Sequence, residues 1–545
     1  MCGFFIELSS SIGAIAARSK MRSHLEKRGP DSTNVVTGDN WVGEFYRLAI
    51  VSEVGVGEQP VQLGGNQFLF FNGEIYNWKK LTPAGQNFNS DTELLAYLIS
   101  VNGIAKAVNQ LEGMYAIAVY DETTRTLQIA RDYPGIKPLY YHNSGDRVLV
   151  CSDLDTIVDD LSAKLNPDRV SELMAFRHVL APNTLYSSIY QCSPGEIVTF
   201  KLGGANKFSQ VSEQIYILED KFGFELATTV GLRAELENSI ILQSKSIHEP
   251  STLLSSGIDS GLIALILLQE YKELGAFSVY FDDQAYSERR DIEEDWLGKN
   301  IDISFFLDQH RCIDGDLVEN YVRFKGGPIT VGNEISLVQL FEVIKQKTSV
   351  VLSGEGADEL FLGYDRAVKN LKEWAGADMN PRVMINRFLT NYYYIPCDDI
   401  AMVATLSDVF GGIEDKLLQI HTEFGWQKMY QYFFLIYHIP ALLDRLDKTS
   451  MFQSVEARVP FLSQSILKYA LGHDLGDPLI KGSKGIIGKR LLRQVAVDVG
   501  GVDFGLRSKM GFPHPVFSGS SQSHLISGTS GWIHDQFNYF KGIRG

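Results

Sequence analysis

The stretch "TLLSSGIDSGL" (residues 252–262) joins a short apolar run to an apolar, helix-like segment through small polar residues. Four of these can present backbone N–H groups and hydroxyls to an anion, assisted by the positive N-terminal end of the helix: Ser255, Ser256, Gly257 and Ser260. A plain Ser/Gly-rich turn would have the same composition. Asp259 would repel a phosphate, but its presence is explained if it holds a Mg²⁺ ion that bridges phosphate oxygens.

A second junction of this kind follows at "SVVLSGEGADELFLGYDR" (349–366). It runs from an apolar strand through Ser353 and Gly354 into acidic residues. Asp358 would complete the Mg²⁺ site, and Glu355 would act on protons during attack by an amine. Two matched strand-to-loop junctions indicate a ligand that lies across the carboxyl ends of parallel strands.

Strands and helices divide the chain into two parts. The runs "STLL", "FSVYF", "IDISFF" and "SVVLSG" alternate with helical patterns, which predicts a mostly parallel α/β sheet followed, from about residue 375, by mainly helical structure. Before them, "FLFFNGEIYN", "MYAIAVYD", "TLQIARD" and "RVLVCSD" predict antiparallel strands. In the helical pattern "SDTELLAYLISV", Ser90 or Asp91 could cap the start of the helix. The polar segment "KLGGANKFSQVSEQ" (201–214) is interpreted as a linker, and we place the domains at 1–208 and 209–545.

Composition excludes several classes of protein. The chain has 545 residues, 45% of them hydrophobic, and a formal net charge of −16, which argues against a broad nucleic-acid-binding surface. No apolar run is long enough for a membrane span, and the N-terminus does not read as a signal peptide. The five cysteines are scattered without zinc or disulfide spacing. These features predict a protein of the reducing cytoplasm.

The N-terminal sequence "MCGFF" raises the question of whether removal of Met1 makes Cys2 the first residue. A free α-amine on the same carbon could then take the thiol proton, which would make Cys2 an N-terminal nucleophile; a cysteine at this place can also be incidental. In "FNGEIYN" (71–77), Asn72 could donate its side-chain N–H and Gly73 its backbone N–H to an oxyanion. An Asn-Gly hairpin turn is the alternative interpretation.

Ordered motifs decide between these interpretations: "MCGFF", "RGPDS" (28–32), "YRLAI" (46–50), "FNGEIYN", "SDTELL" (90–95), "LEGMYAIAVYD" (111–121) and "ARDYPGIKPLYY" (130–141). Together they resemble the glutamine amidotransferase domain of asparagine synthetases. The resemblance implies a four-layer αββα N-terminal nucleophile (Ntn) hydrolase fold. It implies that Cys2 attacks the glutamine amide and that Asn72 and Gly73 form the oxyanion hole. Arg47 would then hold the glutamine α-carboxylate, and Glu74 and Asp91 would meet its α-ammonium.

The second half resembles the synthetase domain of the same enzymes, a parallel α/β domain of the ATP pyrophosphatase family with added helices. The further matches are "VEARVPFL" (455–462), "KRLLR" (489–493) and "RSKMGFPHP" (507–515). The resemblance implies that Lys489 steadies the pyrophosphate and the adenylated intermediate. Glu456 and Arg458 are either an internal ion pair or a functional one. The chain departs from the common pattern at Ser256, Leu362, Lys448 and Ser463, and in the segment 280–291.

The resemblance implies a ligase that uses ATP and Mg²⁺ to adenylate an acceptor carboxylate and amidates it with ammonia channelled from glutamine. Aspartate is the family's usual acceptor, and the departures keep sugar acids and natural-product carboxylates open. A glutaminase or glutamine sensor, a ring-closing ligase and a non-enzymatic scaffold are the other classes considered. All expected ligands are small molecules, with no nucleic acid or membrane. Homodimers are common in the family, while the sequence leaves the oligomeric state open.

Overall fold

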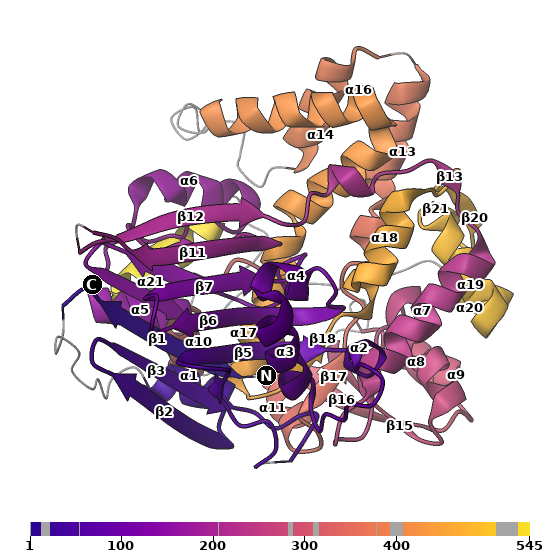
Figure 1. The fold of residues 1–545 in the computed structure, drawn as a ribbon. Helices are drawn as coiled ribbons and strands as arrows, with labels where there is room; N and C mark the ends of the chain where they lie inside the picture. The colour runs from indigo at the N-terminus through magenta and orange to yellow at the C-terminus, as the bar shows by residue number, and fades with distance from the viewer. Residues whose placement is uncertain are drawn as a thin grey trace.

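The computed structural model describes residues 2–11, 22–53, 55–204, 206–281, 287–308, 315–377, 379–392, 407–507 and 532–544 (Figure 1). The N-terminal half contains two antiparallel sheets. The first has the order β10–β8–β9–β1–β3–β2, with β1 (Gly3–Ser9), β2 (Ser32–Gly38), β3 (Trp41–Arg47), β8 (Tyr140–Asn143), β9 (Arg147–Cys151) and β10 (Tyr190–Gln191). The second has the order β12–β11–β7–β6–β5–β4, with β4 (Val61–Gln62), β5 (Gln67–Ile75), β6 (Gly113–Asp121), β7 (Thr126–Arg131), β11 (Glu196–Leu202) and β12 (Phe208–Gln214).

The two sheets stack face to face, and successive side chains along a strand point alternately between the sheets and outward. Phe4 and Ile6 of β1 enter the same buried cluster as Ala116 of β6, whereas Phe5 and Tyr115 point to opposite outer faces. This period of two is what a strand buried on both faces requires. The surrounding helices of this half are α1 (Arg22–Arg28), α2 (Trp78–Leu81), α3 (Asp91–Asn102), α4 (Ile104–Val108), α5 (Leu154–Leu161) and α6 (Pro167–Phe176).

Helices α3 and α4 cover the outer face of the second sheet, and α1, α5 and α6 cover that of the first. The predicted αββα layering is therefore confirmed. Of the two residues predicted to cap α3, Ser90 is the cap: its side chain accepts from the Glu93 N–H.

The interpretation of residues 201–214 as a linker is wrong. Strand β11 continues to Leu202, and β12 pairs with it in antiparallel register. Leu202 lies opposite Phe208 at one end of the pairing, and Glu196 lies opposite Gln214 at the other. Apart from Phe208, the side chains of β12 are exposed, so this edge strand has the polar composition of a linker. The domain boundary at 208/209 falls at the start of this strand and stays a prediction.

The C-terminal half contains a parallel sheet with the order β16–β15–β14–β17–β18, as the alternating pattern predicted. Its strands are β14 (Ser251–Leu253), β15 (Leu274–Phe281), β16 (Ile301–Asp308), β17 (Val350–Leu352) and β18 (Glu456–Arg458). Strands β14 and β17 are neighbours, but the chain continues from β14 to β15 on one side and from β17 to β18 on the other. The loops that follow β14 and β17 therefore lie at the switch point of the sheet. These are the two loops singled out in the sequence.

Helices surround this sheet and extend beyond it, as predicted for the region after residue 375 (Figure 1). They are α7 (Thr229–Ser244), α8 (Ile258–Glu270), α9 (Arg289–Trp296), α10 (Gly315–Lys325), α11 (Glu334–Lys345), α12 (Ala357–Leu360), α13 (Asp365–Gly376), α14 (Pro381–Tyr392), α16 (Ser407–Tyr437), α17 (Ile439–Phe452), α18 (Gln464–Gly472), α19 (Arg490–Gly500), α20 (Val502–Gly505) and α21 (Trp532–Arg544). The short elements are η2 (Glu219–Lys221), η3 (Pro460–Leu462), β13 (Glu225–Leu226), β19 (His473–Asp474), β20 (Ile480–Gly482) and β21 (Gly485–Ile487).

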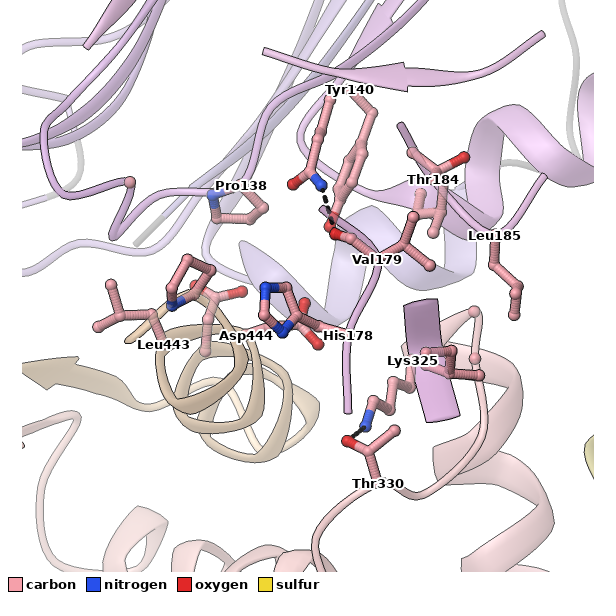
Figure 2. Close-up of a pocket in the computed structure, with 18 of the residues that line it drawn as sticks. Pro138, Tyr140, His178, Val179, Thr184, Leu185, Lys325, Thr330, Leu443 and Asp444 are labelled. Carbon is pink, nitrogen blue, oxygen red and sulfur yellow. Dashed lines mark hydrogen bonds between the residues drawn. The ribbon is translucent and has the colours of Figure 1, made fainter. Parts of the chain in front are cut away.

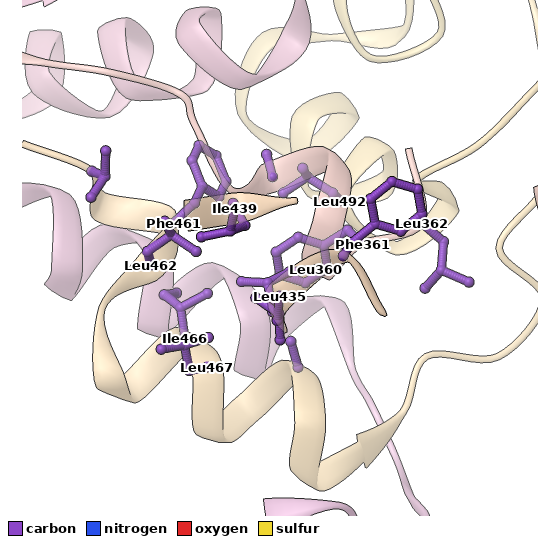
Figure 3. Close-up of a cluster of buried hydrophobic side chains, with 14 of the residues drawn as sticks. Leu360, Phe361, Leu362, Leu435, Ile439, Phe461, Leu462, Ile466, Leu467 and Leu492 are labelled. Carbon is purple, nitrogen blue, oxygen red and sulfur yellow. The ribbon is translucent and has the colours of Figure 1, made fainter. Parts of the chain in front are cut away.

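A buried apolar cluster fixes the second loop against these helices. Leu360 and Leu362 pack in one core with Leu435 of α16, Leu467 of α18 and Leu492 of α19 (Figure 3). The loop after β17 is thus anchored from several directions. Helices α10, α17 and α21 pack on the same outer face of the first sheet as α1, α5 and α6, so the two halves share a buried interface.

Candidate active sites

Cys2 lies directly before β1, and its backbone N–H donates to Oδ1 of Asn72 at 2.9 Å. Its Sγ lies 4.0 Å from the carbonyl oxygen of Leu48. Burial raises the pKa of the Cys2 thiol above its ordinary value, although the positive charge of the chain terminus opposes the shift. Such a thiol needs a base to become a thiolate nucleophile. Met1 lies outside the described residues, so its removal stays a prediction.

The predicted oxyanion donors lie on β5 beside Cys2. Asn72 is fully buried, and its Nδ2 has no hydrogen-bond partner among the described residues. A buried donor without a partner is costly, which fits a donor that a developing oxyanion would use. A Cβ at Gly73 would lie 2.0 Å from the carbonyl oxygen of Met114. Only glycine therefore allows β5 and β6 to approach this closely, and the hairpin-turn alternative is wrong because both residues lie within β5.

Arg47 ends β3 and is buried. Its Nη1 donates to Oε1 of Glu58 at 2.7 Å, and its Nη2 donates to the carbonyl oxygens of Ser52 at 3.2 Å and Val56 at 2.6 Å. Arg47 thus orders the loop between β3 and β4. The side chain of Gln59 ties this loop to β5, because its Oε1 accepts from the Phe71 N–H at 2.6 Å. The proposed contact of Arg47 with a glutamine carboxylate stays a prediction.

Glu74 and Asp91 are both buried and interact electrostatically with one another. Burial raises the pKa of Glu74 well above its ordinary value, and Glu456 and Asp91 add to the rise. Burial raises the pKa of Asp91 to about 6, against the hydrogen bonds that its carboxylate accepts from Ile75 and Thr92. Both carboxyl groups would gain from a cationic ligand, which is what the predicted contact with an α-ammonium would supply.

The phosphate-type loop follows β14 and is held by its own hydroxyls. Ser260 Oγ accepts from the Ser255 N–H at 3.1 Å, and Ser255 Oγ accepts from the Gly257 N–H at 3.2 Å. Ser256 donates its N–H and its hydroxyl to the Glu288 carboxylate at 3.1 and 2.7 Å. A carboxylate therefore already occupies part of this anion site. Sequence reasoning missed Glu288, although it lies in the segment 280–291 that was noted as unusual.

Asp259, Asp358 and Lys489 come together from three distant segments. Lys489 Nζ lies 2.7 Å from a carboxylate oxygen of Asp259 and 2.7 Å from Oδ1 of Asp358. A Cβ at Gly363 would lie 2.0 Å from Asp358 Oδ1 and 2.1 Å from Lys489 Cε, so this glycine is required by the cluster. Asp259 belongs to the first turn of α8, and Asp358 to that of α12.

The carboxylates of Asp259 and Asp358 fit a Mg²⁺ ion, which prefers a few carboxylates together with substrate phosphates and water. Among the described residues, no group of three or more His, Cys, Asp or Glu side chains is arranged to hold a metal.

Glu355 follows β17 and forms an ion pair with Arg445 of α17. Arg445 is buried, and its Nη1 also donates to Asn333 at 3.4 Å. Ser353 donates its backbone N–H to the Arg458 carbonyl at 2.8 Å. A Cβ at Gly354 would lie 3.1 Å from Asp259 Cβ, so the two loops touch. Sequence reasoning missed Arg445, since an isolated arginine in a helix normally indicates a surface charge.

Three of the four departures from the family pattern have hydrogen-bond partners, and Leu362 packs in the core. Lys448 bonds to Asp153 at 3.2 Å across the interface of the two halves, and Ser463 caps α18. Leu362 has φ of 58° and is fully buried. Ser256 is not among the residues with positive φ, so its side chain is compatible with the loop. In "RSKMGFPHP", residues 508–515 lie outside the described residues.

Figure 2 shows a cavity of about 110 Å³ between the two halves of the chain. Its walls include His178, which follows α6, and Leu443 and Asp444 of α17. Lys325 in its wall is neutralised by Glu334 at 2.7 Å. None of the predicted site residues is among the described residues that line this cavity, so it is separate from both candidate sites.

Two family models match this chain in comparisons with known proteins. Residues 1–211 match the family model described as a glutamine amidotransferase domain, and residues 231–537 match the model described as asparagine synthase. Asparagine synthetase [glutamine-hydrolyzing] 3 of Bacillus subtilis is 26% identical over 491 residues, which are 83% of this chain and 77% of that protein. Asparagine synthetase [glutamine-hydrolyzing] 1 of the same organism is 26% identical over 541 residues, or 91% and 83% of the two chains.

A vertebrate relative, the asparagine synthetase [glutamine-hydrolyzing] of Gallus gallus, is 27% identical over 387 residues, or 67% of each chain. In the part of the chain that the structure describes, every helix is too short or too polar to cross a membrane. The fold, the two ordered sets of side chains and the family matches lead to one assignment: this chain belongs to the asparagine synthase family and carries an N-terminal glutamine amidotransferase domain.

Proposed function

We propose that this protein releases ammonia from glutamine at Cys2 and uses it to amidate a carboxylate that ATP has activated, with aspartate as the first acceptor to test. The observation that carries the proposal is the convergence of Asp259, Asp358 and Lys489 where β14 and β17 end. A glutaminase or glutamine sensor without synthetase activity would have no use for this cluster. A ring-closing ligase would have no use for the groups around Cys2.

At the first site the Cys2 thiolate attacks the carboxamide carbon of glutamine. The oxyanion that forms would accept from Nδ2 of Asn72 and the N–H of Gly73, and such donors typically contribute about 10²–10³ in rate. Arg47, Glu74 and Asp91 would hold the α-carboxylate and α-ammonium. Collapse of the intermediate releases ammonia and leaves a thioester, which water hydrolyses to glutamate.

At the second site the acceptor carboxylate attacks the α-phosphorus of ATP, with pyrophosphate as the leaving group. The loop from Ser255 to Ser260 and the residues Ser353 and Gly354 would bind the nucleotide. Mg²⁺ held by Asp259 and Asp358 would offset negative charge on the phosphates. Lys489 would stabilise the pyrophosphate. Ammonia then attacks the acyl-adenylate to give a tetrahedral intermediate, whose nitrogen loses a proton as AMP departs; Glu355 would receive that proton.

Two candidate functions share these steps and differ only in the acceptor carboxylate. The buried Arg445 and the partly exposed Glu355 form a charge pair at this site, which suits an acceptor that carries charged groups besides the reacting carboxylate. Two of the departures have structural partners, since Lys448 bonds to Asp153 and Ser463 caps α18. Amidation of a sugar acid or a natural-product carboxylate by the same steps is the second candidate.

The test is pyrophosphate release from ATP, Mg²⁺ and glutamine across a panel of carboxylates that begins with aspartate, with product mass measured in parallel. The Cys2→Ala variant should lose glutamine-dependent amidation and keep ammonia-dependent amidation. Release with aspartate and formation of asparagine would support the first version. Release only with another carboxylate would support the second, and glutamine hydrolysis without pyrophosphate release under any condition would refute the synthetase proposal.

A further inference from the structure

Arg458 lies between the two candidate sites and is fully buried. It ends β18, and its Nε donates to Oε1 of Glu456 at 2.6 Å. The internal ion pair considered from the sequence is therefore present. The same side chain has further contacts in both directions, which an isolated structural pair would not need.

Toward the glutamine site, Nη2 of Arg458 lies 3.8 Å from Oε1 of Glu74. Its guanidinium carbon lies 5.7 Å from the centre of the Tyr76 ring. Arg458 is thus a positive charge beside the carboxylate that we propose to bind the glutamine α-ammonium. A bound ammonium and Arg458 would compete for the same carboxylate, so ligand binding there changes the electrostatic environment of Arg458.

Toward the synthetase site, Arg458 is connected through the backbone. Its carbonyl oxygen accepts from the Ser353 N–H at 2.8 Å, at the first residue of the loop that carries Glu355 and Asp358. Its Nη1 donates to the carbonyl oxygens of Gln243 and Lys245 at 2.7 and 2.8 Å, where α7 ends. A small shift of Arg458 therefore moves β18 and the start of the nucleotide loop with it.

We propose that Arg458 is a positioning residue that couples glutamine binding at Glu74 to the conformation of the Ser353 loop. The inference rests on the proposed function of the two sites. It requires that a ligand in one site change the affinity of the other, and such coupling is reciprocal. Arg458 would not touch either substrate, since it acts through Glu74 on one side and Ser353 on the other.

The experiment measures the KM of glutamine hydrolysis by the full chain with and without ATP and Mg²⁺. In the wild type we expect the nucleotide to change this KM by about fivefold or more, the lower end of typical coupling. In Arg458→Gln the change should disappear while hydrolysis itself persists. Arg458→Lys keeps the charge but loses most of the hydrogen bonds, so it should retain part of the nucleotide effect on KM. It also replaces Arg458→Gln in the test if that variant does not fold.

The matched control is Arg28→Lys. Arg28 is also a fully buried arginine, and it joins the two halves by pairing with Asp447 at 2.8 Å without contact to a predicted site residue. This variant should keep the nucleotide effect. The proposal is overturned if the wild type shows no effect of ATP on KM, if Arg458→Gln keeps the effect, or if Arg28→Lys loses it equally. A wild type that shows the effect but releases no pyrophosphate would refute the proposed function and leave the coupling standing.

Discussion

At the scale of single residues, Asp91 is a carboxyl group whose charge state falls within a measurable pH range. Burial raises its pKa to about 6 from an ordinary value of 3.8. If the Asp91 carboxylate binds the α-ammonium of glutamine, protonation removes that contact. We therefore predict that kcat/KM for glutamine hydrolysis falls as the pH drops below about 6, because kcat/KM reports ionisations of the free enzyme.

The sign for stability is the opposite. Since the folded-state pKa lies above the unfolded value, the folded protein binds more protons between pH 3.8 and about 6, and the contribution of Asp91 to stability falls as the pH rises through that range. Asp91→Asn should lower kcat/KM by about 10- to 100-fold, as expected for a lost hydrogen bond to a charged group. Glu93→Gln, in the same helical turn, should leave the profile unchanged; a profile that Asp91→Asn also leaves unchanged would exclude the assigned contact.

Residues at the ends of strands were predictable, whereas their partners from remote helices were not. Asp259 and Asp358 follow neighbouring parallel strands, and the carboxyl ends of such strands meet at one edge of the sheet. Arg445 reaches Glu355 from a helix ninety positions further along the chain, and no local pattern marks it. The family resemblance assigned Lys489 to the nucleotide site, but its contacts with both carboxylates come from the structure alone.

At the scale of elements, hydrophobic patterning located strands well where both faces are buried and failed at an exposed edge. Strand β6 is buried along most of its length and was recognised from "MYAIAVYD". Strand β12 buries only Phe208, so its composition could not distinguish it from a linker. Pairing with β11 supplies the backbone hydrogen bonds that hold it as a strand, and that pairing leaves no trace in the sequence of β12 itself.

Helix α16 offers a test of element geometry. It is interrupted at Gly425, which has φ of 83° and ψ of 173°, a conformation essentially restricted to glycine. A Cβ at this position would have no neighbour within 4 Å among the described residues, so backbone strain alone opposes a side chain. We predict that Gly425→Ala destabilises the protein by about 1–3 kcal/mol, measured by urea unfolding.

The same helix provides the control. Gly411 lies in the helix, is exposed and has equally open space around the position of a Cβ. Gly411→Ala should stabilise by about 0.5–1 kcal/mol, because glycine within a helix costs that much relative to alanine. If both substitutions change the free energy of unfolding equally, the backbone at Gly425 does not require glycine.

At the scale of the whole molecule, buried charges join the two halves. Arg28 of α1 donates to both carboxylate oxygens of Asp447 on α17, at 2.8 and 3.1 Å, and Lys448 bonds to Asp153 nearby. Burial opposes the charge of Asp447, but Arg28 lowers its pKa below the ordinary value of 3.8. Because the folded-state pKa is depressed, the stability that this pair supplies is present above pH 3.8 and is lost as the pH falls further.

Removal of one partner of this pair should therefore affect the whole molecule. Arg28→Met leaves the Asp447 carboxylate buried without its cation, which should cost about 3–5 kcal/mol and lower the calorimetric transition of both halves together. The double change Arg28→Met with Asp447→Leu should recover much of this loss, because apolar side chains then replace both charges. Arg290→Met breaks the exposed pair with Glu294 and should cost less than about 1 kcal/mol. Two separate transitions in Arg28→Met, with only one of them lowered, would show that the buried interface does not make the halves unfold as a unit.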